Sequence, residues 1–216
     1  MIKLCIFDMD GLLIDSERQM WVPHEKQALS EMGYPVREGF LNSLMGLSNE
    51  NSRSVLKDEY GDGFDVDEFY RRVIGYNNEM VETKGIPLKQ GAVELLEYLK
   101  NKGIRIALGT SSTRDYVEAV LSKAGVFDYF EKVVCGDEIV NGKPAPDIYI
   151  KAKSGFGVQD DETLIFEDAH NGALAALGSG CQLVLVPDIA YLPEEDLNNA
   201  YAVIDKLDDI IEILEK

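Results

Sequence analysis

Short runs of β-branched and aliphatic residues recur along the chain, far enough apart to hold a helix between them, and this alternation most constrains the fold. The runs are Leu4–Phe7, Ile104–Leu108, Lys132–Val134, Leu164–Phe166 and Leu183–Val186. Helix-length amphipathic segments separate most of them. Strands that alternate with helices imply parallel pairing. The sequence therefore predicts an α/β fold built on a parallel sheet.

The stretch from Asp15 to about Leu88 breaks this alternation, because it contains helical patterns and no convincing strand. Helices are expected at Glu17–Met32, Asn51–Glu59 and Asp67–Thr83. Glycine and proline turns separate these segments and mark the return to the alternating pattern. We therefore expect residues 1–14 and 89–216 to form the α/β core and residues 15–88 to form an inserted helical domain.

The charge balance argues against polyanionic partners. The chain has 216 residues and a formal net charge of -18 at pH 7, spread along the sequence. Such a surface repels DNA, RNA and anionic membranes. A small phosphate ester is not excluded, because salt screens surface fields over about 8 Å and a local cation can dominate inside a cleft. We expect a small-molecule partner, no nucleic acid and no membrane, and either a monomer or a small homo-oligomer.

The cysteines and the first residues indicate the compartment. Cys5, Cys135 and Cys181 are odd in number and include no C-x-x-C pair, which fits neither a disulfide framework nor a zinc site. The apolar start is too short, and is interrupted too early by Asp8, for a signal peptide or a membrane span. Both features predict a reduced, cytoplasmic protein.

A pair of aspartates, Asp8 and Asp10, follows the first predicted strand in the segment FDMDGLLIDS. Residues two apart in an extended segment face the same side, so both carboxylates point together at the carboxyl end of the strand. Ligands of open parallel sheets bind at that edge. Adjacent carboxylates repel each other unless a cation lies between them or one carries a proton. The motif alone leaves open the alternative of a solvated turn.

Hydroxyl groups follow the second strong strand and precede a helix. Thr110 and Ser111 lie in this turn, where hydroxyls and free backbone N–H groups can form a cradle for an anion. The alternative is an ordinary helix cap, in which Ser112 or Thr113 bonds the amides of the first turn. This segment alone favours the cap.

A lysine and two acidic residues complete the groups with chemical potential. Lys143 lies in the proline-rich loop NGKPAPD, whose stiff backbone suits an ammonium held against an anion. Glu167 and Asp168 follow another predicted strand and would reach the same sheet edge, where carboxylate oxygens suit Mg²⁺. Asp168 is also a candidate N-cap for the next helix. A lone loop lysine is usually solvated, so Lys143 gains weight only from these neighbours.

Together these groups resemble the four motifs of haloacid dehalogenase superfamily phosphatases. D-x-D-G-x-x-x-D-S from Asp8, Thr/Ser after the second strand, K-P-x-P-D from Lys143 and E-D from Glu167 occur in the family's order and spacing. The resemblance spans the whole chain, and residues 91–112 and 125–130 also resemble the subfamily I branch that contains β-phosphoglucomutase and phosphoglycolate-type phosphatases. It implies a Rossmann-like core with a C1-type helical cap.

The resemblance implies a role for each matching residue. Asp8 would attack phosphorus and form an aspartyl phosphate, and Asp10 would protonate the leaving oxygen and then deprotonate water. Thr110 would hydrogen-bond the phosphoryl group, with Ser111 beside it, while Lys143 would offset its charge. The implied Mg²⁺ ligands are Asp8, the carbonyl of Asp10, Glu167 and Asp168.

The reaction is expected to be hydrolysis, with a mutase as the alternative. True dehalogenases do not use the second aspartate as an acid, so Asp10 favours phosphorus chemistry. β-Phosphoglucomutase typically has a cap histidine where this chain has Met20, and a cap arginine where it has residues 47–49. A mutase must hold a distal phosphate, so the missing arginine favours a phosphatase. His24 and Arg53 are the candidates that could substitute.

Two further classes remain weaker. A phosphonoacetaldehyde hydrolase would need a Schiff-base lysine, for which Lys26 is the candidate in the first cap helix, but a lysine there is usually solvated. A non-catalytic phosphometabolite-binding protein stays open because fold does not fix function. Loss of Asp8 or Asp168 would favour it, and both are present.

Cap residues that face the cleft are expected to choose the substrate, because the four motifs contact only the phosphoryl group and the metal. The candidates are Glu17, Met20, Trp21, Gly46, Leu47, Ser48, Asn49 and Arg53, and we assign substrate binding to Gly46, Asn49 and Arg53. Trp21 would stack on a sugar or base, or else pack in the core. Sugar phosphates, phosphoglycolate-like acids and nucleoside monophosphates all remain open.

Overall fold

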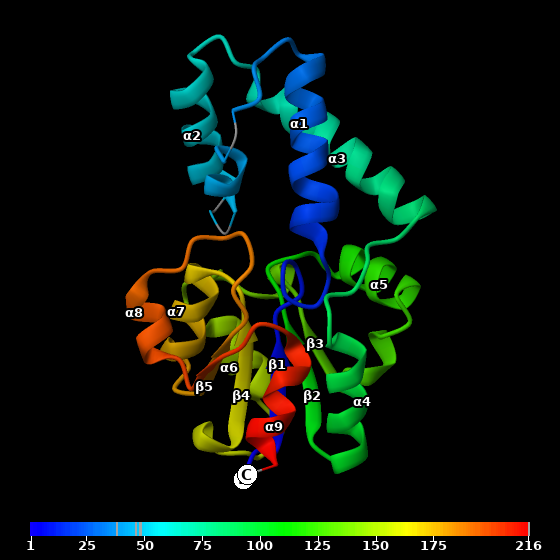
Figure 1. The fold of residues 1–216 in the computed structure, drawn as a ribbon, viewed down its shortest axis with the longest axis vertical. Helices are drawn as coiled ribbons and strands as arrows, with labels where there is room; N and C mark the ends of the chain where they lie inside the picture. The colour runs from blue at the N-terminus through cyan, green and yellow to red at the C-terminus, as the bar shows by residue number, and fades with distance from the viewer. Residues whose placement is uncertain (38, 46, 48, 216) are drawn as a thin grey trace.

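The computed structural model describes residues 1–37, 39–45, 47 and 49–215, and these form a six-stranded sheet with helices around it (Figure 1). The strands are β1 (Leu4–Phe7), β2 (Arg105–Gly109), β3 (Lys132–Val134), β4 (Thr163–Glu167), β5 (Gln182–Leu185) and β6 (Ala202–Val203). Their order is β3-β2-β1-β4-β5-β6, and every pairing is parallel. The predicted α/β fold with a Rossmann-like sheet is confirmed. β6 was not predicted, because two residues give no readable pattern.

The register of the central strand brings three strand ends to one edge. Phe7 at the end of β1 pairs with Leu108 of β2 on one side and with Phe166 of β4 on the other. The segments that follow these strands therefore leave the sheet side by side. The topology alone predicts that their polar residues meet.

Helices cover both faces of the sheet because alternate residues of each strand point to opposite sides. Cys5 and Phe7 belong to the core beneath α4 (Ala92–Lys102), α5 (Arg114–Lys123) and α9 (Ile210–Leu214). Leu4 and Ile6 belong to the opposite core, beneath α6 (Asp147–Lys153) and α7 (His170–Gly178), and α8 (Glu194–Asn199) packs against α7. The result is a three-layer sandwich in which β1 is wholly buried.

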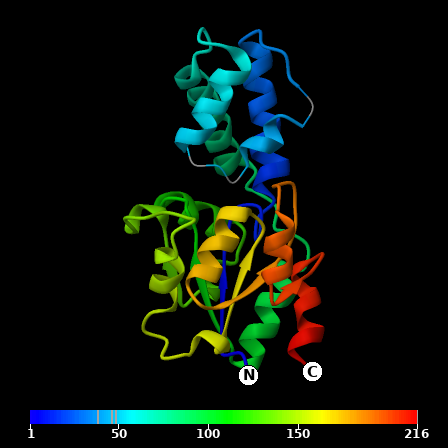
Figure 2. The same cartoon turned by 90° about the vertical axis from the view of Figure 1, so that its left-hand side faces the viewer.

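The segment between β1 and α4 forms a separate helical group above the sheet edge (Figures 1 and 2). It contains a π-helical turn (Glu17–Trp21), α1 (Val22–Glu31), α2 (Asn49–Tyr60) and α3 (Val66–Thr83). These helices bury their own core, which includes Leu29, Leu56 and Phe69. The chain enters and leaves this helical group through two adjacent segments, which are joined by an antiparallel β-bridge between Ile14 and Leu88. We propose residues 15–88 as the extent of this cap.

The three cysteines are free and buried, as expected for small apolar side chains. Burial raises the pKa of the Cys5 thiol well above its usual range, so this group stays protonated. None of the helices among the described residues combines the length and the apolar character needed to cross a membrane.

Candidate active site

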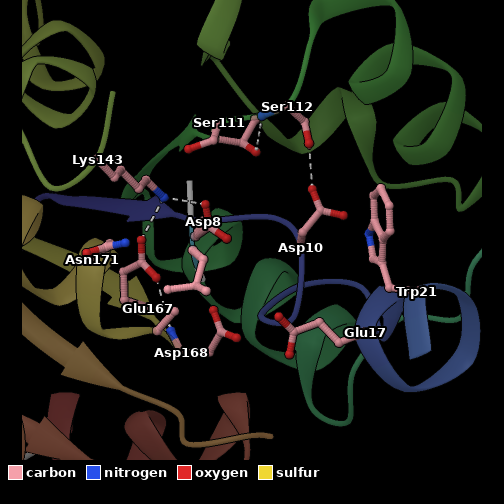
Figure 3. Close-up of a pocket in the computed structure, with 14 residues that line it drawn as sticks. Asp8, Asp10, Glu17, Trp21, Ser111, Ser112, Lys143, Glu167, Asp168 and Asn171 are labelled. Carbon is pink, nitrogen blue, oxygen red and sulfur yellow. Dashed lines mark hydrogen bonds and ion pairs between the residues drawn. The ribbon is translucent and has the colours of Figure 1, made fainter. Parts of the chain in front are cut away.

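The first motif places two carboxylates at the carboxyl edge of the sheet. Asp8 follows β1 directly and is buried, while Asp10 is partly exposed to the cleft. Asp10 Oδ2 accepts a hydrogen bond from Ser112 Oγ at 2.7 Å (Figure 3). Its Oδ1 atom accepts a hydrogen bond from the Tyr116 hydroxyl at 3.2 Å. Burial raises the pKa of Asp10 although these donors oppose the shift, so the protonated form is favoured relative to a free aspartate.

Lys143 connects carboxylates that come from different strands. Its Nζ atom lies 2.5 Å from Asp8 Oδ1 and 2.6 Å from Glu167 Oε1 (Figure 3). The buried Tyr149 hydroxyl donates a further hydrogen bond to Glu167 Oε1. Burial alone would lower the pKa of Lys143, but Asp8 and Glu167 raise it above its usual value. Lys143 is therefore a fixed positive charge on the floor of the cleft.

Asp8, Glu167 and Asp168 form a group that fits a divalent cation. Each offers an oxygen, and these oxygens lie within 4.8 Å of one another. Asp168 Oδ2 is buried and has no hydrogen-bond partner among the described residues. Burial raises the pKa of Asp8 to about 7, with Glu167 adding to the shift and Lys143 opposing it. Three buried carboxylates against one ammonium leave an excess of negative charge, which hard cations with oxygen ligands balance.

Two glycines let the chain approach these carboxylates closely. A Cβ atom on Gly11, which has a φ of +81°, would lie 2.3 Å from Asp168 Oδ2. A Cβ atom on Gly172 would lie 1.9 Å from Glu167 Oε1. The expectation that Asp168 caps α7 is wrong. Its N-cap is Ala169 without a side-chain bond, because the Asp168 side chain is turned toward Gly11 and the acidic group.

The turn after β2 presents its hydroxyls to the cleft. Thr110 is buried and its Oγ1 accepts a hydrogen bond from Ser112 N at 3.1 Å, whereas Ser111 is exposed along the cleft wall. The capping alternative is wrong, since neither Ser112 nor Thr113 caps α5 with its side chain. Asp137 instead accepts the first-turn N–H of Arg114 at 3.3 Å, and this leaves the Ser112 hydroxyl for Asp10.

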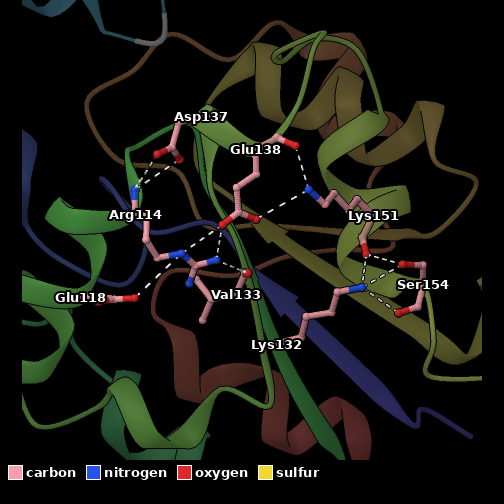
Figure 4. A network of polar contacts seen from close by, with 8 residues as sticks. All are labelled: Arg114, Glu118, Lys132, Val133, Asp137, Glu138, Lys151 and Ser154. Carbon is pink, nitrogen blue, oxygen red and sulfur yellow. Dashed lines mark hydrogen bonds and ion pairs between the residues drawn. The ribbon is translucent and has the colours of Figure 1, made fainter.

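A second acidic group, Cys135, Asp137 and Glu138, also has the spacing of metal ligands. Here, however, cations already pair with the Glu138 carboxylate, and Asp137 accepts the backbone N–H of Arg114 (Figure 4). Arg114 Nε lies 3.0 Å from Glu138 Oε1, and Lys151 Nζ lies 3.7 Å from its Oε2. The charge of Glu138 is therefore balanced by side chains of the protein, whereas the group around Asp8 has three carboxylates and one ammonium.

The cleft between the cap and the sheet edge has two connected parts. The first, which we call the catalytic chamber, is a cavity of about 400 Å³ lined by Asp8, Asp10, Glu17, Trp21, Leu47, Thr110, Ser111, Ser112, Lys143, Glu167, Asp168, Ala169, Asn171 and Gly172. The second, the cap chamber, is a cavity of about 470 Å³ lined by Asp10, Glu17, Trp21, Glu25, Leu44, Met45, Leu47, Ser52, Arg53, Tyr70, Ile74 and Ser111. The two chambers share Asp10, Glu17, Trp21, Leu47 and Ser111 in their linings, so they adjoin each other.

The cap residues expected at the cleft are only partly found there. Glu17, Trp21 and Leu47 line both chambers, and Arg53 lines the cap chamber while its guanidinium lies 2.6 Å from Asp67 Oδ1. The expectation for Met20 is wrong. Its side chain is fully buried in the core above the sheet, because the helical turn directs it away from the cleft.

The remaining cap expectations have different outcomes. Gly46 and Ser48 lie outside the described residues, and Asn49 begins α2 with its side chain outside that description. His24 Nδ1 lies 2.6 Å from Asn77 Oδ1 of α3, and Lys26 is exposed. Neither residue lines either chamber.

Sequence reasoning missed several side chains that shape the site. Tyr116 of α5 donates a hydrogen bond to Asp10, and Tyr149 of α6 donates one to Glu167. Neither tyrosine belongs to a sequence motif. Glu25 of the cap chamber had a readable signal, because it follows Glu17 by eight residues and would lie on the same helical face.

Comparison with known proteins agrees with this geometry. The family model described as haloacid dehalogenase-like hydrolase matches residues 5–186. A probable pseudouridine-5'-phosphatase of Drosophila melanogaster is 36% identical over 95% of this chain and 90% of its own. A phosphorylated carbohydrates phosphatase of Thermotoga maritima is 29% identical over 85% and 84%.

A solved structure extends the match to the whole fold. A Thermotoga maritima protein assigned as a beta-phosphoglucomutase superposes with a TM-score of 0.79, at 27% identity and over 99% of each chain. Proteins of this family generally use a divalent metal ion, which agrees with the excess negative charge around Asp8. The chain belongs to the haloacid dehalogenase-like hydrolase family.

Proposed function

We propose that this chain is a Mg²⁺-dependent phosphatase that hydrolyses a small phosphorylated metabolite through an aspartyl phosphate on Asp8. One observation carries the proposal: the group of Asp8, Glu167 and Asp168 lies beside Lys143 on the floor of a cleft. Relatives named as phosphatases support hydrolysis of a phosphoric monoester. The cleft volume suits a small metabolite.

In the first step the Asp8 carboxylate attacks phosphorus, and the bond between phosphorus and the leaving oxygen breaks. Asp10 donates its proton to that oxygen, so the leaving group departs as a neutral alcohol. The raised pKa of Asp10 supports this role, and Ser112 and Tyr116 hold the carboxyl in place. Thr110 and Ser111 donate hydrogen bonds to the phosphoryl oxygens, and the Lys143 ammonium offsets their charge.

In the second step Asp10, now a carboxylate, takes a proton from water. The water oxygen attacks phosphorus, the bond to Asp8 breaks, and inorganic phosphate leaves. Asp8 and Asp10 return to their starting protonation states, so the cycle closes.

Asp8, Asp168 and the backbone carbonyl of Asp10 would hold Mg²⁺, with Glu167 beside them. A bound divalent ion would lower the repulsion between the Asp8 carboxylate and a phosphate dianion. Glu167 is the least available ligand, because Oε1 already accepts from Lys143 and Tyr149 and Oε2 accepts from Asp168 N.

The test is release of p-nitrophenol from p-nitrophenyl phosphate with Mg²⁺ and with EDTA. We expect turnover only with the metal, and a phosphoryl group trapped on the peptide that contains Asp8 after acid quenching. Metal-independent turnover, or no turnover under either condition, would contradict the proposal.

A mutase of the β-phosphoglucomutase type is tested in the same experiment. Incubation with β-glucose 1-phosphate should release phosphate without forming glucose 6-phosphate. His24 contacts α3 rather than the cleft, which supports hydrolysis. We also propose a cytoplasmic location. We further propose that the protein is a monomer or a small homo-oligomer, and size-exclusion chromatography with light scattering would test this oligomeric state.

A further inference from the structure

The cap chamber contains a buried acid that the proposed chemistry does not use. Glu25 lies on α1, is 3% exposed and lines this chamber. Its Oε2 atom has no hydrogen-bond partner within the part of the chain that the structure describes. A buried polar atom without a partner is costly, so its presence at a cavity wall calls for a ligand.

Among the described residues, the charged neighbour that acts on Glu25 is an acid rather than a cation. Burial raises the pKa of Glu25 to about 8, and the nearby Glu17 adds to the shift. Arg53 shares the chamber, but its guanidinium lies 2.6 Å from the exposed Asp67 and stacks over the Tyr70 ring at 5.3 Å. Among the described lining residues, acidic groups therefore outnumber the cation.

The helix brings three cleft residues into one line. Glu17, Trp21 and Glu25 follow one another at intervals of four, which is the spacing of side chains on one helical face. Glu17 and Trp21 line both chambers, whereas Glu25 lines only the cap chamber. The three side chains therefore lead from the catalytic chamber, near Asp10, into the cap chamber. A leaving group bound in the cleft extends in the same direction.

We infer that Glu25 is a specificity residue that accepts hydrogen bonds from hydroxyl groups at the far end of the leaving group. This inference rests on the proposed phosphatase activity. A leaving group that starts at Asp10 passes Trp21, whose ring offers an apolar face to sugar carbons, before it reaches Glu25. A carboxyl oxygen satisfies hydroxyl donors, and a site built for hydroxyls rejects an analogue that lacks them. The substrate class is thus a polyhydroxylated phosphomonoester.

The test compares two substrates of equal chain length, sorbitol 6-phosphate and n-hexyl phosphate, in wild type and variants with Mg²⁺. The measured quantity is the ratio of the two kcat/KM values. Glu25→Leu should lower this ratio at least about tenfold, because the substrate hydroxyls lose their acceptor. Glu25→Gln, which keeps one acceptor oxygen, should give an intermediate ratio. Glu79→Leu, the same change at an exposed position of the cap helix α3, should leave the ratio at the wild-type value.

The outcomes separate this inference from the proposed function. Thermal unfolding of each variant establishes that the compared proteins are folded. A ratio in folded Glu25→Leu within twofold of wild type would overturn the inference, as would a wild-type enzyme that does not prefer sorbitol 6-phosphate. Neither result touches the phosphatase assignment as long as p-nitrophenyl phosphate is hydrolysed. Failure of wild type on all three esters would overturn the phosphatase proposal and the inference with it.

Discussion

The two chambers of the cleft differ in how far the protein's own side chains compensate their buried carboxylates. In the catalytic chamber Lys143 bridges Asp8 and Glu167, and the whole group fits a divalent cation. In the cap chamber Glu25 Oε2 is buried without a hydrogen-bond partner among the described residues, and so is Oε2 of Glu17, which lines both chambers. In the catalytic chamber, Lys143 offsets much of the carboxylate charge. In the cap chamber, the carboxyl oxygens depend on a bound molecule for hydrogen bonds.

This difference indicates that the catalytic chamber binds the phosphoryl group and that the cap chamber selects the leaving group. A phosphoryl group is the same in every phosphomonoester, so a fixed lysine and metal site can serve all substrates. The leaving group differs between substrates. A buried acceptor without a partner favours substrates that donate a hydrogen bond to it over substrates that cannot. Changes in the catalytic chamber should therefore act on all substrates, whereas changes in the cap chamber should act selectively.

Replacing Asp8 should have the largest effect on turnover. Asp8→Asn should lower kcat by about 10⁴-fold or more, because an amide cannot form the phosphoryl intermediate. Metal and phosphate should still bind weakly, since most ligands remain, and isothermal titration calorimetry with Mg²⁺ measures this. Asp58→Asn, at an exposed position of α2, is the matched control and should keep wild-type kinetics. Near-normal turnover of Asp8→Asn on any substrate would remove Asp8 from the mechanism.

Replacing Lys143 should have the next largest effect. Lys143→Met keeps most of the length of the side chain but removes the charge between Asp8 and Glu167, so kcat/KM should fall about 10² to 10³-fold on every substrate. Stability should fall by about 3 kcal/mol, because two buried carboxylates lose their partner. Mg²⁺ should restore part of this loss in thermal unfolding. Lys151→Met, in the exposed Glu138 group, should change neither quantity by a comparable amount.

Gly11 tests whether the close approach to Asp168 matters beyond backbone strain. Gly11→Ala places a Cβ atom 2.3 Å from Asp168 Oδ2, whereas Gly33 has a similar φ of +79° and nothing within 4 Å of its Cβ position. Both variants should lose about 1 kcal/mol of stability from the left-handed backbone. Only Gly11→Ala should also weaken Mg²⁺ binding, by about tenfold. Equal Mg²⁺ affinity in the two variants would show that Asp168 tolerates displacement.

The last prediction concerns the pH dependence of stability contributed by Glu25, which should leave catalysis on p-nitrophenyl phosphate unaffected. The folded pKa of about 8 lies above the ordinary value of 4.5, so the fold favours the protonated form. This contribution to stability is complete below about pH 4.5 and is lost as the pH rises to about 8. Glu25→Leu should remove it and stabilise the protein relative to wild type by on the order of 2 kcal/mol at high pH, but by much less at low pH. Urea unfolding at about pH 5 and pH 8.5 measures both, and an equal difference at the two values would contradict the assignment.

The sequence predicted the core motifs better than the cap, for a physical reason. Asp8 and Glu167 directly follow buried strands, and parallel pairing of Phe7 with Phe166 brings them together whatever the intervening chain does. Met20 lies in a π-helical turn that no local pattern revealed, and this turn directs its side chain away from the cleft. Tyr149 reaches Glu167 only through the packing of α6, so its role could not be predicted before the fold was known.

The proposed chemistry depends above all on a divalent ion bound between Asp8 and Asp168. Crystals soaked with Mn²⁺, which replaces Mg²⁺ and scatters anomalously, would reveal the position of this ion. We expect one strong anomalous peak within about 2.2 Å of oxygens of both Asp8 and Asp168. A strong peak at Asp137 and Glu138 instead, or no peak near Asp8 at saturating Mn²⁺, would contradict it.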